Sequence, residues 1–393
     1  MTREVVVVGA TRTAVGTYGG SLKELPPTKL GAIAIKEAVA RAGIAPDTIG
    51  HVVMGNVIHG EARDMYLSRV AALDAGLPVG TPCLTVNRLC GSGLQAIVSA
   101  AQHIMLGDTD IVVGGGAESM SRSAYIMPAA RWGQRMGDAP ITDMMLAALH
   151  DPFGHGHMGI TAENIATKYG ITRDTQDAFA LASHARAASA IKEGRFKSQI
   201  VGVELASKKG PVMFDTDEHV RIDVKIDDLA KLKPAFKKDG SVTAGNASGI
   251  NDGAAAIVMM EAGAAGRAKL KPIARLVGYA HAGVDPQLMG LGPIPAVRRV
   301  FEKTGLKPGD IDVIESNEAF AVQAMAVTRD LELDPARVNP NGGAVALGHP
   351  VGATGAILTV KAIYELQRIG KRYALVTMCI GGGQGIAAIF ERI

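Results

Sequence analysis

The chain has 393 residues, of which 47% are hydrophobic and 20% charged, and its formal net charge is +3 at pH 7. This length predicts two or three domains with a large core, and the composition is that of an ordinary globular enzyme. The nearly balanced charge, without a basic stripe carrying interleaved aromatic residues, gives no reason to expect nucleic-acid binding. With 48 glycines and 4% aromatic residues, the interior is expected to consist of small aliphatic side chains, as in layered α/β folds.

The cysteines and the chain ends indicate the compartment. Cys83, Cys90 and Cys379 are too few and too scattered for a disulfide framework, and no spacing resembles a zinc site, so we expect reduced thiols and no metal. The N-terminus enters a strand pattern at once, without the features of a signal peptide. No apolar run reaches the roughly 18 residues of a membrane span, and the C-terminus carries no peroxisomal signal. We therefore expect a cytoplasmic protein with no membrane partner.

The first 119 residues alternate strand and helix signals. Strands are predicted at 4–9, 51–54, 83–86 and 110–114, and helices at 28–41, at 65–75 and directly after Cys90. Thr28 is the expected N-cap of the first helix, and Gly43 its end. Regular alternation of this kind favours a parallel sheet flanked by helices.

The middle of the chain has a different texture. Residues 120–249 are rich in Met, His and charged side chains, with one clear helix pattern at 173–192 and long irregular stretches, which in compact domains are usually lids or ligand clamps. A strand pattern resumes at 254–260, and a second β/α series runs from Lys271 to the end. We expect residues 1–119 and 250–272 to form one half, 120–249 an inserted loop domain, and 273–393 the other half.

The two β/α series resemble each other. The spacing from Gly93, before a predicted helix, to Ile111 in the following strand equals the spacing from Gly355 to Tyr373. A duplicated α/β unit explains this equality, although any two α/β halves share a glycine, helix and strand rhythm.

Cys90 lies in the turn before the first of these helices, and His349 lies in the comparable turn before the second. In open α/β sheets such turns are where ligands bind. The glycines beside Cys90 allow close backbone approach, and the N-terminus of the following helix favours a thiolate over a thiol. The alternative interpretation is a buried structural cysteine, since free Cys is among the most buried residue types.

Three further clusters occur at strand ends or helix starts, namely Asn317-Glu318-Ala319-Phe320, Gly348-His349-Pro350 and Cys379-Ile380-Gly381-Gly382-Gly383. His349 can serve as the base for a nucleophilic cysteine, and Cys379 can serve as a second acid or base. The backbone N–H groups of Cys90 and of the Gly381 region can form an oxyanion hole. A lone His in such a turn is more often structural, but four clusters at equivalent positions indicate acyl transfer.

These motifs together resemble the thiolases over the whole chain. The matching runs are Asn87-x-x-Cys90-x-Ser92-Gly93, Asn317-Glu318-Ala319-Phe320, Asn339-Pro340-Asn341-Gly342-Gly343 with Gly348-His349-Pro350, and Cys379-x-Gly381-Gly382-Gly383. The chain looks most similar to bacterial acetyl-CoA acetyltransferases and broad-range β-ketothiolases. The resemblance implies a five-layered α/β/α/β/α core made of two similar halves. It also implies ping-pong acyl transfer that makes or cleaves short-chain 3-ketoacyl-CoA, such as acetoacetyl-CoA.

The resemblance also implies residue roles. Cys90 takes up the acyl group, His349 activates it, and Cys379 moves the α-proton of the second acyl-CoA. Asn317 holds a water in one oxyanion hole, while the N–H groups of Cys90 and Gly381 form the other. The implied acyl and CoA contacts are Leu149, His157, Met158, Arg221, Phe236, Ala244, Ser248, Met289, Ala319 and Phe320. Without the family, Phe236 and Met289 also fit an ordinary core, and Arg221 a solvated charge.

The family further implies that CoA thioesters are substrates, that no cofactor is permanently bound and that the protein is a homotetramer, a dimer of dimers. The family also implies a role in fatty acid metabolism or polyhydroxyalkanoate biosynthesis. A decarboxylating condensing enzyme would be expected to have His or Asn in place of Cys379, and a non-catalytic lipid-binding relative would have a damaged site. A dinucleotide-dependent oxidoreductase is disfavoured because Gly381 to Gly385 lead into a strand pattern and not into a helix.

Overall fold

The computed structural model describes residues 3–393, which are organised around one mixed eleven-stranded sheet. Its main path runs β13-β14-β15-β12-β1-β11-β5-β3-β4, with the short strands β2 (Gly16–Thr17) and β8 (Ile200–Val201) paired to β11 and β1. The strands of the path are β1 (Val5–Thr13), β3 (His51–Gly55), β4 (Cys83–Val86), β5 (Ile111–Ser119), β11 (Asn251–Glu261), β12 (Ala274–Gly283), β13 (Val313–Ser316), β14 (Tyr373–Ile380) and β15 (Gln384–Glu391).

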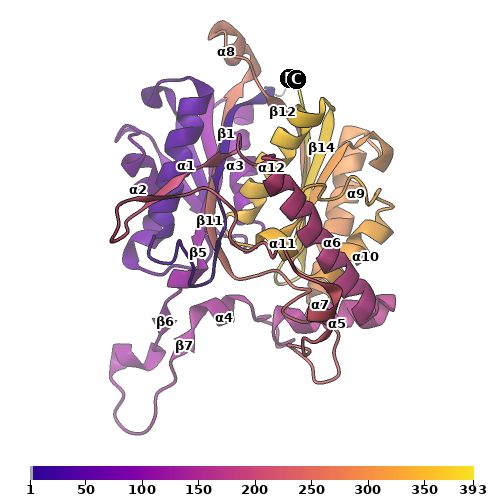
Figure 1. The fold of residues 1–393 in the computed structure, drawn as a ribbon. Helices are drawn as coiled ribbons and strands as arrows, with labels where there is room; N and C mark the ends of the chain where they lie inside the picture. The colour runs from indigo at the N-terminus through magenta and orange to yellow at the C-terminus, as the bar shows by residue number, and fades with distance from the viewer. Residues whose placement is uncertain (1–2) are drawn as a thin grey trace.

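The helices lie in three layers separated by the two halves of this sheet (Figure 1). The central layer is α3 (Ser92–Leu106) and α12 (Thr354–Ile369), whose apolar residues share one core with strands of both halves. The outer layers are α1 (Pro27–Ala42) with α2 (Leu67–Asp74) on one half, and α9 (Pro293–Thr304) with α10 (Ala321–Asp330) on the other. The expected five-layered α/β/α/β/α core is therefore confirmed.

The two halves share one strand order. In the first half, β1 is followed across the sheet by β11, β5, β3 and β4; in the second, β12 is followed by β15, β14 and β13. An isolated parallel bridge between Ile314 of β13 and Val338 stands where β4 pairs with β3. The repeated order confirms the predicted duplication.

The helices α3 and α12 touch at the two glycines that indicated the duplication. A Cβ on Gly93 would lie 2.7 Å from the backbone nitrogen of Ala356, and one on Gly355 would lie 2.3 Å from the backbone nitrogen of Leu94. Only hydrogen side chains allow the helix N-termini to approach this closely. The turns before the two helices are thereby brought together at the centre of the molecule.

The expected strand 110–114 is longer than predicted, and the sheet is mixed and not parallel. β5 continues through the glycines to Ser119, because a Cβ on Gly114 would lie 2.9 Å from the Ile97 Cα of α3, and one on Gly116 would lie 2.2 Å from the Gly352 carbonyl oxygen. These glycines permit close packing in a strand instead of ending it. The antiparallel pair β14 and β15 follows from the short turn that joins them.

Two helix starts differ from the predictions. The first helix begins at Pro27 with Pro26 as its N-cap, not at Thr28, because proline at the first helical position gives up no helical N–H bond. Gly43 ends it in the left-handed conformation, as expected. The helix expected at 65–75 is a 3₁₀ turn, Ala62–Tyr66, followed by the shorter α2.

Residues 120–249 contain more helix than predicted. α6 (Arg173–Lys192) has the expected bounds, but α5 (Met158–Tyr169) was not anticipated; its N-cap is the His157 side chain, an unusual capping residue whose Nδ1 accepts the Gly159 N–H at 3.0 Å. The short strands β6 (Tyr125–Ile126) and β7 (Thr142–Asp143) form an arm that projects from the body (Figure 1). The remaining elements are α4 (Met144–Ala148), α7 (Ile226–Ala230), β9 (Val203–Leu205), β10 (Val212–Phe214), α8 (Ala262–Arg267), α11 (Ala344–Leu347) and four 3₁₀ turns at 46–48, 120–122, 128–132 and 308–310, with a fifth at Pro286–Leu291.

One segment of the described chain, Leu89–Leu106, is long and apolar enough to span a membrane by length and composition, with a mean hydropathy of 1.2. The expectation that no run reaches this length was therefore too strict. The segment coincides with α3, which packs against α12 and both halves of the sheet. Its apolar character is that of a central core helix, which passes the same test.

Candidate active site

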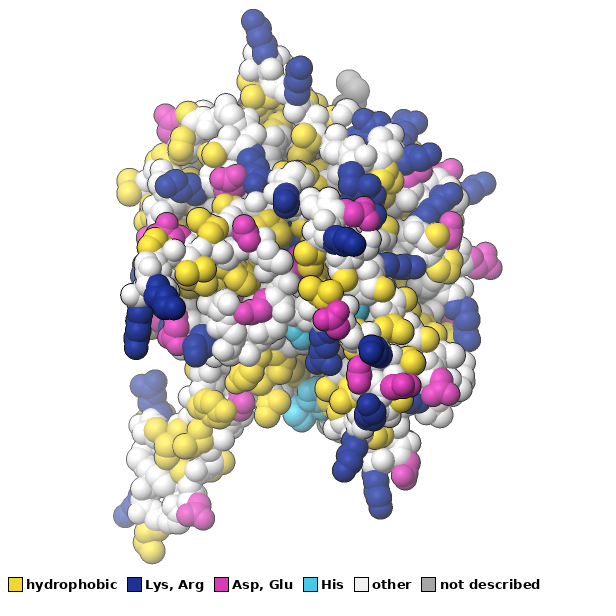
Figure 2. Space-filling model, viewed as in Figure 1, with side chains coloured by type: hydrophobic (Ala, Val, Ile, Leu, Met, Phe, Trp, Pro, Cys, Tyr) yellow, Lys and Arg dark blue, Asp and Glu magenta, His cyan; other side chains and the backbone are white. Residues whose placement is uncertain are grey.

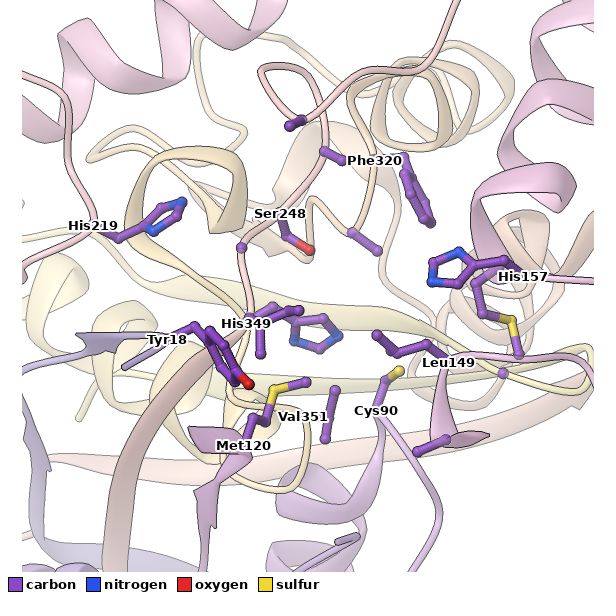
Figure 3. A pocket seen from close by; sticks show the side chains of 18 of the residues that line it. Tyr18, Cys90, Met120, Leu149, His157, His219, Ser248, Phe320, His349 and Val351 are labelled. Atoms are coloured by element: carbon purple, nitrogen blue, oxygen red, sulfur yellow. The ribbon is translucent and has the colours of Figure 1, made fainter. Parts of the chain in front are cut away.

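A cavity of about 700 Å³ lies between residues of the insertion and the turns that follow the strands (Figure 3). Cys90, His349, Cys379 and Gly381 all line it. Cys90 comes from the first half and the other three from the second, so the cavity joins the equivalent turns of the duplication. The structure therefore brings together the residues that the sequence selected from distant motifs.

The turn that carries Cys90 is strained and held by local hydrogen bonds. Leu89 adopts φ +44°, which is costly for a residue with a branched side chain. Its N–H donates to Asn87 Oδ1 at 2.9 Å. The Ser92 hydroxyl donates to the Leu89 carbonyl oxygen at 2.6 Å and accepts the Arg88 N–H at 2.8 Å. These contacts fix the direction in which the Cys90 side chain leaves the turn.

The sulfur of Cys90 lies where two backbone donors converge. Burial raises the pKa of the Cys90 thiol, while its own N–H and the Gly381 N–H donate to the sulfur and oppose that rise. The sequence-based expectation that the turn favours a resting thiolate is thus wrong, because desolvation outweighs the donors. The two N–H groups nevertheless lie within hydrogen-bonding reach of the sulfur.

His349 is buried and held from both sides of its ring. Its backbone N–H donates to Asn251 Oδ1 at 2.9 Å. Its Nδ1 lies 2.6 Å from Thr354 Oγ1, and its Nε2 lies 3.4 Å from Asn317 Nδ2. Burial lowers the pKa of His349 to about 4, so the imidazole is neutral near pH 7. A neutral imidazole can accept a proton from a thiol beside it.

Cys379 is fully buried at the end of β14. Burial raises its pKa far above the ordinary value, and the neighbouring Cys90 raises it further. The two cysteines are therefore close enough for the charge of one to affect the ionisation of the other. Cys379 is therefore a protonated thiol in the resting protein.

Asn317 does not line the cavity, but its Nδ2 contacts Nε2 of His349, which does. Its Oδ1 is buried and has no hydrogen-bond partner among residues 3–393. A buried amide oxygen of this kind can bind a water. The neighbouring Glu318 has a role that sequence reasoning missed: its carboxylate accepts from Ser183 Oγ of α6 at 2.7 Å and from Asn339 Nδ2 at 2.8 Å, tying the insertion to the second half.

All ten residues selected for acyl and CoA contacts line the same cavity: Leu149, His157, Met158, Arg221, Phe236, Ala244, Ser248, Met289, Ala319 and Phe320. The Phe236 ring stacks on His157 with centroids 4.6 Å apart and meets Phe320 edge to face at 6.1 Å. The Ser248 N–H donates to the Ala319 carbonyl oxygen at 3.0 Å, which aligns the two segments. The wall opposite Cys90 is therefore apolar and aromatic (Figure 3).

Comparison with known proteins identifies this arrangement. Residues 5–263 match the thiolase N-terminal domain, and residues 270–392 match the thiolase C-terminal domain. The chain belongs to the thiolase family. Over their full lengths it is 66% identical to the beta-ketothiolase BktB of Cupriavidus necator and 50% identical to the acetyl-CoA acetyltransferase of Allochromatium vinosum.

Solved thiolase structures have the same fold. The acetyl-CoA acetyltransferase of Bacillus anthracis superposes with a TM-score of 0.98 at 46% identity, covering 100% of this chain and 99% of that one. The human mitochondrial 3-ketoacyl-CoA thiolase in complex with CoA superposes with a TM-score of 0.96 at 43% identity, covering 100% and 98%. The predicted family and fold are thus confirmed, and thiolases act on CoA thioesters.

One lip of the thiolase cavity is anchored to the core by a buried ion pair. The segment that carries His219 and Arg221 follows Asp217, whose two carboxylate oxygens accept from the Arg12 guanidinium at 2.7 and 2.9 Å. The adjacent Glu218 accepts the Thr17 N–H at 2.9 Å. Arg221 itself lines the cavity and is exposed. In Figure 2, histidine side chains gather near the middle of this face, beside a basic side chain.

Several cavity residues of this thiolase were not selected from the sequence. Leu89 lies inside the quoted Cys90 motif and His219 lies two residues before the selected Arg221, so both could have been found there, whereas Tyr18 and Val57 belong to segments with no distinguishing pattern. Among residues 3–393, no group of three or more metal-ligating side chains occurs. The unselected lining residues are Thr17, Tyr18, Val57, Leu89, Met120, Leu146, Ala148, Glu218, His219, Val220, Ala235, Ala247, Gly249, Ile250 and Val351.

Proposed function

We propose that this thiolase is an acyl-CoA:acetyl-CoA C-acyltransferase that reversibly condenses or cleaves short-chain 3-ketoacyl-CoA, such as acetoacetyl-CoA. The observation that carries the proposal is the convergence of Cys90, His349 and Cys379 on one cavity, with two backbone N–H groups aimed at the Cys90 sulfur. The names of the relatives, beta-ketothiolase and acetyl-CoA acetyltransferase, support the same reaction.

The first half-reaction forms acyl-Cys90. His349 Nε2 takes the thiol proton, and the sulfur attacks the carbonyl carbon of the first acyl-CoA. The bond between that carbon and the CoA sulfur then breaks, and Cys379 gives its proton to the leaving thiolate. The raised pKa of Cys379, caused by burial, keeps this proton in place until the leaving group needs it.

The second half-reaction forms the carbon–carbon bond. The Cys379 thiolate takes an α-proton from acetyl-CoA, and the resulting carbanion attacks the acyl carbon on Cys90. The carbon–sulfur bond to Cys90 breaks, and protonated His349 returns the proton to the sulfur. Every proton is thereby restored, and thiolytic cleavage uses the same steps in reverse.

Two oxyanion holes fit this sequence of steps. The N–H groups of Cys90 and Gly381 form one, and His349 with a water held by Asn317 forms the other. The unpartnered Asn317 Oδ1 supports the second assignment. One such donor is worth about 3 kcal/mol of barrier in other acyl-transfer enzymes.

CoA is proposed to enter between the insertion 120–249 and the second half. Arg221 and Ser248 are assigned to its polar part and the stacked His157 and Phe236 to the pantetheine, with Ala244 and Ala319 beside them. Leu149, Met158, Met289 and Phe320 enclose the acyl end and favour short chains. The reaction as proposed needs no permanently bound cofactor. The proposed domain organisation is one half made of residues 1–119 and 250–272, an inserted loop domain of residues 120–249, and a second half of residues 273–393.

We also propose a cytoplasmic homotetramer, a dimer of dimers, serving fatty acid metabolism or polyhydroxyalkanoate biosynthesis. The projecting arm, on which Figure 2 shows hydrophobic side chains, supports assembly with further copies, because Trp132 is 89% exposed and Met136 90% exposed between β6 and β7. Side chains this apolar are usually covered in an assembly. The three free cysteines fit a reducing compartment. Light scattering in solution measures the number of copies.

Radiolabelled acetyl-CoA tests the mechanism. Label should be trapped on Cys90, and Cys90→Ala should lose at least about 10⁴-fold in turnover because no other nucleophile stands in its place. Cys379→Ser should still take up label yet fail to condense. A Cys90→Ala protein that forms acetoacetyl-CoA at the wild-type rate would sink the proposal. A kcat/KM series over acetoacetyl-, 3-ketovaleryl- and longer 3-ketoacyl-CoA measures the chain-length range.

A further inference from the structure

The first residues of the two central helices are both hydroxyl side chains. Ser92 begins α3 and directly precedes Gly93; Thr354 begins α12 and directly precedes Gly355. Since Gly93 and Gly355 are equivalent in the duplication, Ser92 and Thr354 are equivalent too. Both side chains are buried.

Each hydroxyl donates to a carbonyl oxygen of the preceding turn and makes one further contact, which differs between the halves. Ser92 Oγ donates to a carbonyl oxygen of the preceding turn, that of Leu89, at 2.6 Å, and accepts a backbone N–H, that of Arg88. Thr354 Oγ1 donates to the Pro350 carbonyl oxygen at 2.9 Å. Its second contact, at 2.6 Å, is with His349 Nδ1. The first half thus uses its hydroxyl to hold the nucleophile turn, and the second uses it to touch the catalytic ring itself.

The contacts of Thr354 define which nitrogen of His349 carries the proton. A hydroxyl has one hydrogen, and the hydrogen bond of Thr354 Oγ1 to the Pro350 carbonyl oxygen at 2.9 Å uses it. Thr354 Oγ1 therefore accepts from Nδ1–H. A neutral imidazole protonated at Nδ1 has its lone pair at Nε2, on the side of Asn317, whose Nδ2 is a donor 3.4 Å away.

We infer that Thr354 is a positioning residue that holds His349 in the Nδ1–H tautomer, so that Nε2 is unprotonated and can take the Cys90 proton. The contact replaces the carboxylate that orients histidine in many nucleophilic sites. A hydroxyl adds no negative charge, so it orients the ring without stabilising the imidazolium as a carboxylate does. This agrees with the low pKa of His349, about 4, which burial causes. The inference rests on the proposed function for its kinetic consequence, but not for the tautomer.

The test compares three variants of the full-length protein. Thr354→Val keeps the shape and removes the acceptor, Thr354→Ser restores a hydroxyl, and Thr359→Val is the matched control. Thr359 is buried in the same helix and makes the same kind of bond to a carbonyl oxygen four residues earlier, that of Gly355, at 2.8 Å, without touching the site. If valine at 354 prevents folding, Thr354→Ala removes the same acceptor.

Two readouts separate positioning from a structural role. The rate of single-turnover acylation by acetyl-CoA should fall about 100-fold in Thr354→Val, the effect of losing an aligned general base. The KM for CoA, measured in the thiolytic direction, should be unchanged. The rate of Cys90 alkylation by iodoacetamide at pH 7 should also fall, and its pH midpoint should rise, because Nε2 no longer assists ionisation. Thr354→Ser should stay within about threefold of wild type, and Thr359→Val should match wild type.

The outcomes distinguish the two levels of inference. Wild-type acylation in Thr354→Val, or equal damage in Thr354→Ser or Thr359→Val, overturns the role of Thr354 while leaving the proposed function intact. Failure of the wild-type protein to acylate overturns the proposed function, yet the alkylation profile, which needs no CoA substrate, still decides the role of Thr354.

Discussion

The turn that carries Cys90 and the turn that carries His349 occupy equivalent places in the two halves, before α3 and before α12. In the first, Leu89 is forced to φ +44° and the Cys90 side chain faces the cavity. In the second, Gly348 adopts φ +101° without strain, and the His349 ring is fixed at both nitrogens. In the proposed function, the first turn presents the nucleophilic sulfur and the second restrains the ring that moves its proton.

Burial shifts the pKa values of Cys90 and His349 in opposite directions, and both shifts leave the side chain uncharged. It raises the pKa of the Cys90 thiol and lowers that of His349 to about 4. Both shifts favour the uncharged form. The resting site is therefore a neutral thiol beside a neutral imidazole, and charge separates only as the sulfur attacks.

Among changes that separate the two turns while keeping Cys90 and Cys379, the largest effect is expected from loosening the strained turn. Ser92→Ala removes the hydroxyl that bridges the Arg88 N–H and the Leu89 carbonyl oxygen, so the Cys90 sulfur is no longer held against its donors. Acylation should slow about 100-fold, the usual effect of a misplacement near 1 Å. Single-turnover labelling measures it. Ser99→Ala, a hydroxyl loss further along α3, is the control; equal rates in the two variants would show that the turn holds its shape unaided.

An intermediate effect is expected on the pH dependence of stability. In the unfolded chain His349 titrates near 6.5, but in the folded protein its pKa is about 4. Between these two pH values His349 is protonated in the unfolded chain but stays unprotonated in the folded protein. The contribution is therefore fully present above pH 6.5 and is lost as the pH falls, by about 2 kcal/mol between pH 7.5 and 5.

Urea unfolding of wild type and His349→Asn at both pH values isolates this term from the other buried histidines, which both proteins keep. On acidification from pH 7.5 to 5, the free energy of unfolding of His349→Asn should fall by about 2 kcal/mol less than that of wild type. Identical pH slopes would mean that His349 is not desolvated in the folded protein.

Much of this architecture was predictable from the sequence, for physical reasons that particular residues illustrate. The equal spacings after Gly93 and Gly355 predicted the duplication. Both positions require glycine for the same reason, which is the close contact between α3 and α12. α6 has the bounds that the sequence predicted for the one clear helix pattern in residues 120–249. Cys90, His349 and Cys379, which line one cavity, could be selected from the sequence because each stands in a short motif at a strand end or helix start.

What the sequence did not predict depends on contacts between distant segments. β5 runs through its glycines because α3 and the Gly352 turn press against it. The pKa of Cys90 is raised by burial that no local turn reveals. The role of Glu318 needs Ser183 and Asn339 from two other segments. Local pattern identifies a residue's kind of chemistry; its surroundings decide its charge and its partners.

The smallest effect is expected from the contact that joins the two turns. Gly355→Ala would place a Cβ 2.3 Å from the Leu94 nitrogen, a backbone atom that cannot rotate away, so α3 and α12 must separate. Overpacking of this kind costs at least about 1 kcal/mol, partly offset by the higher helix propensity of alanine. Because both catalytic turns end at these helices, kcat should fall with the free energy of unfolding.

Gly266→Ala in α8 is the matched control, since no atom lies within 4 Å of the Cβ it adds and the substitution should leave stability unchanged or slightly higher. Urea midpoints and kcat are measured for both variants. A Gly355→Ala protein with wild-type stability and wild-type kcat would mean that the two helices can separate without disturbing either turn. Cys90 and His349 would then be held by their own halves alone, and the close glycine contact would serve packing but not the alignment of nucleophile and base.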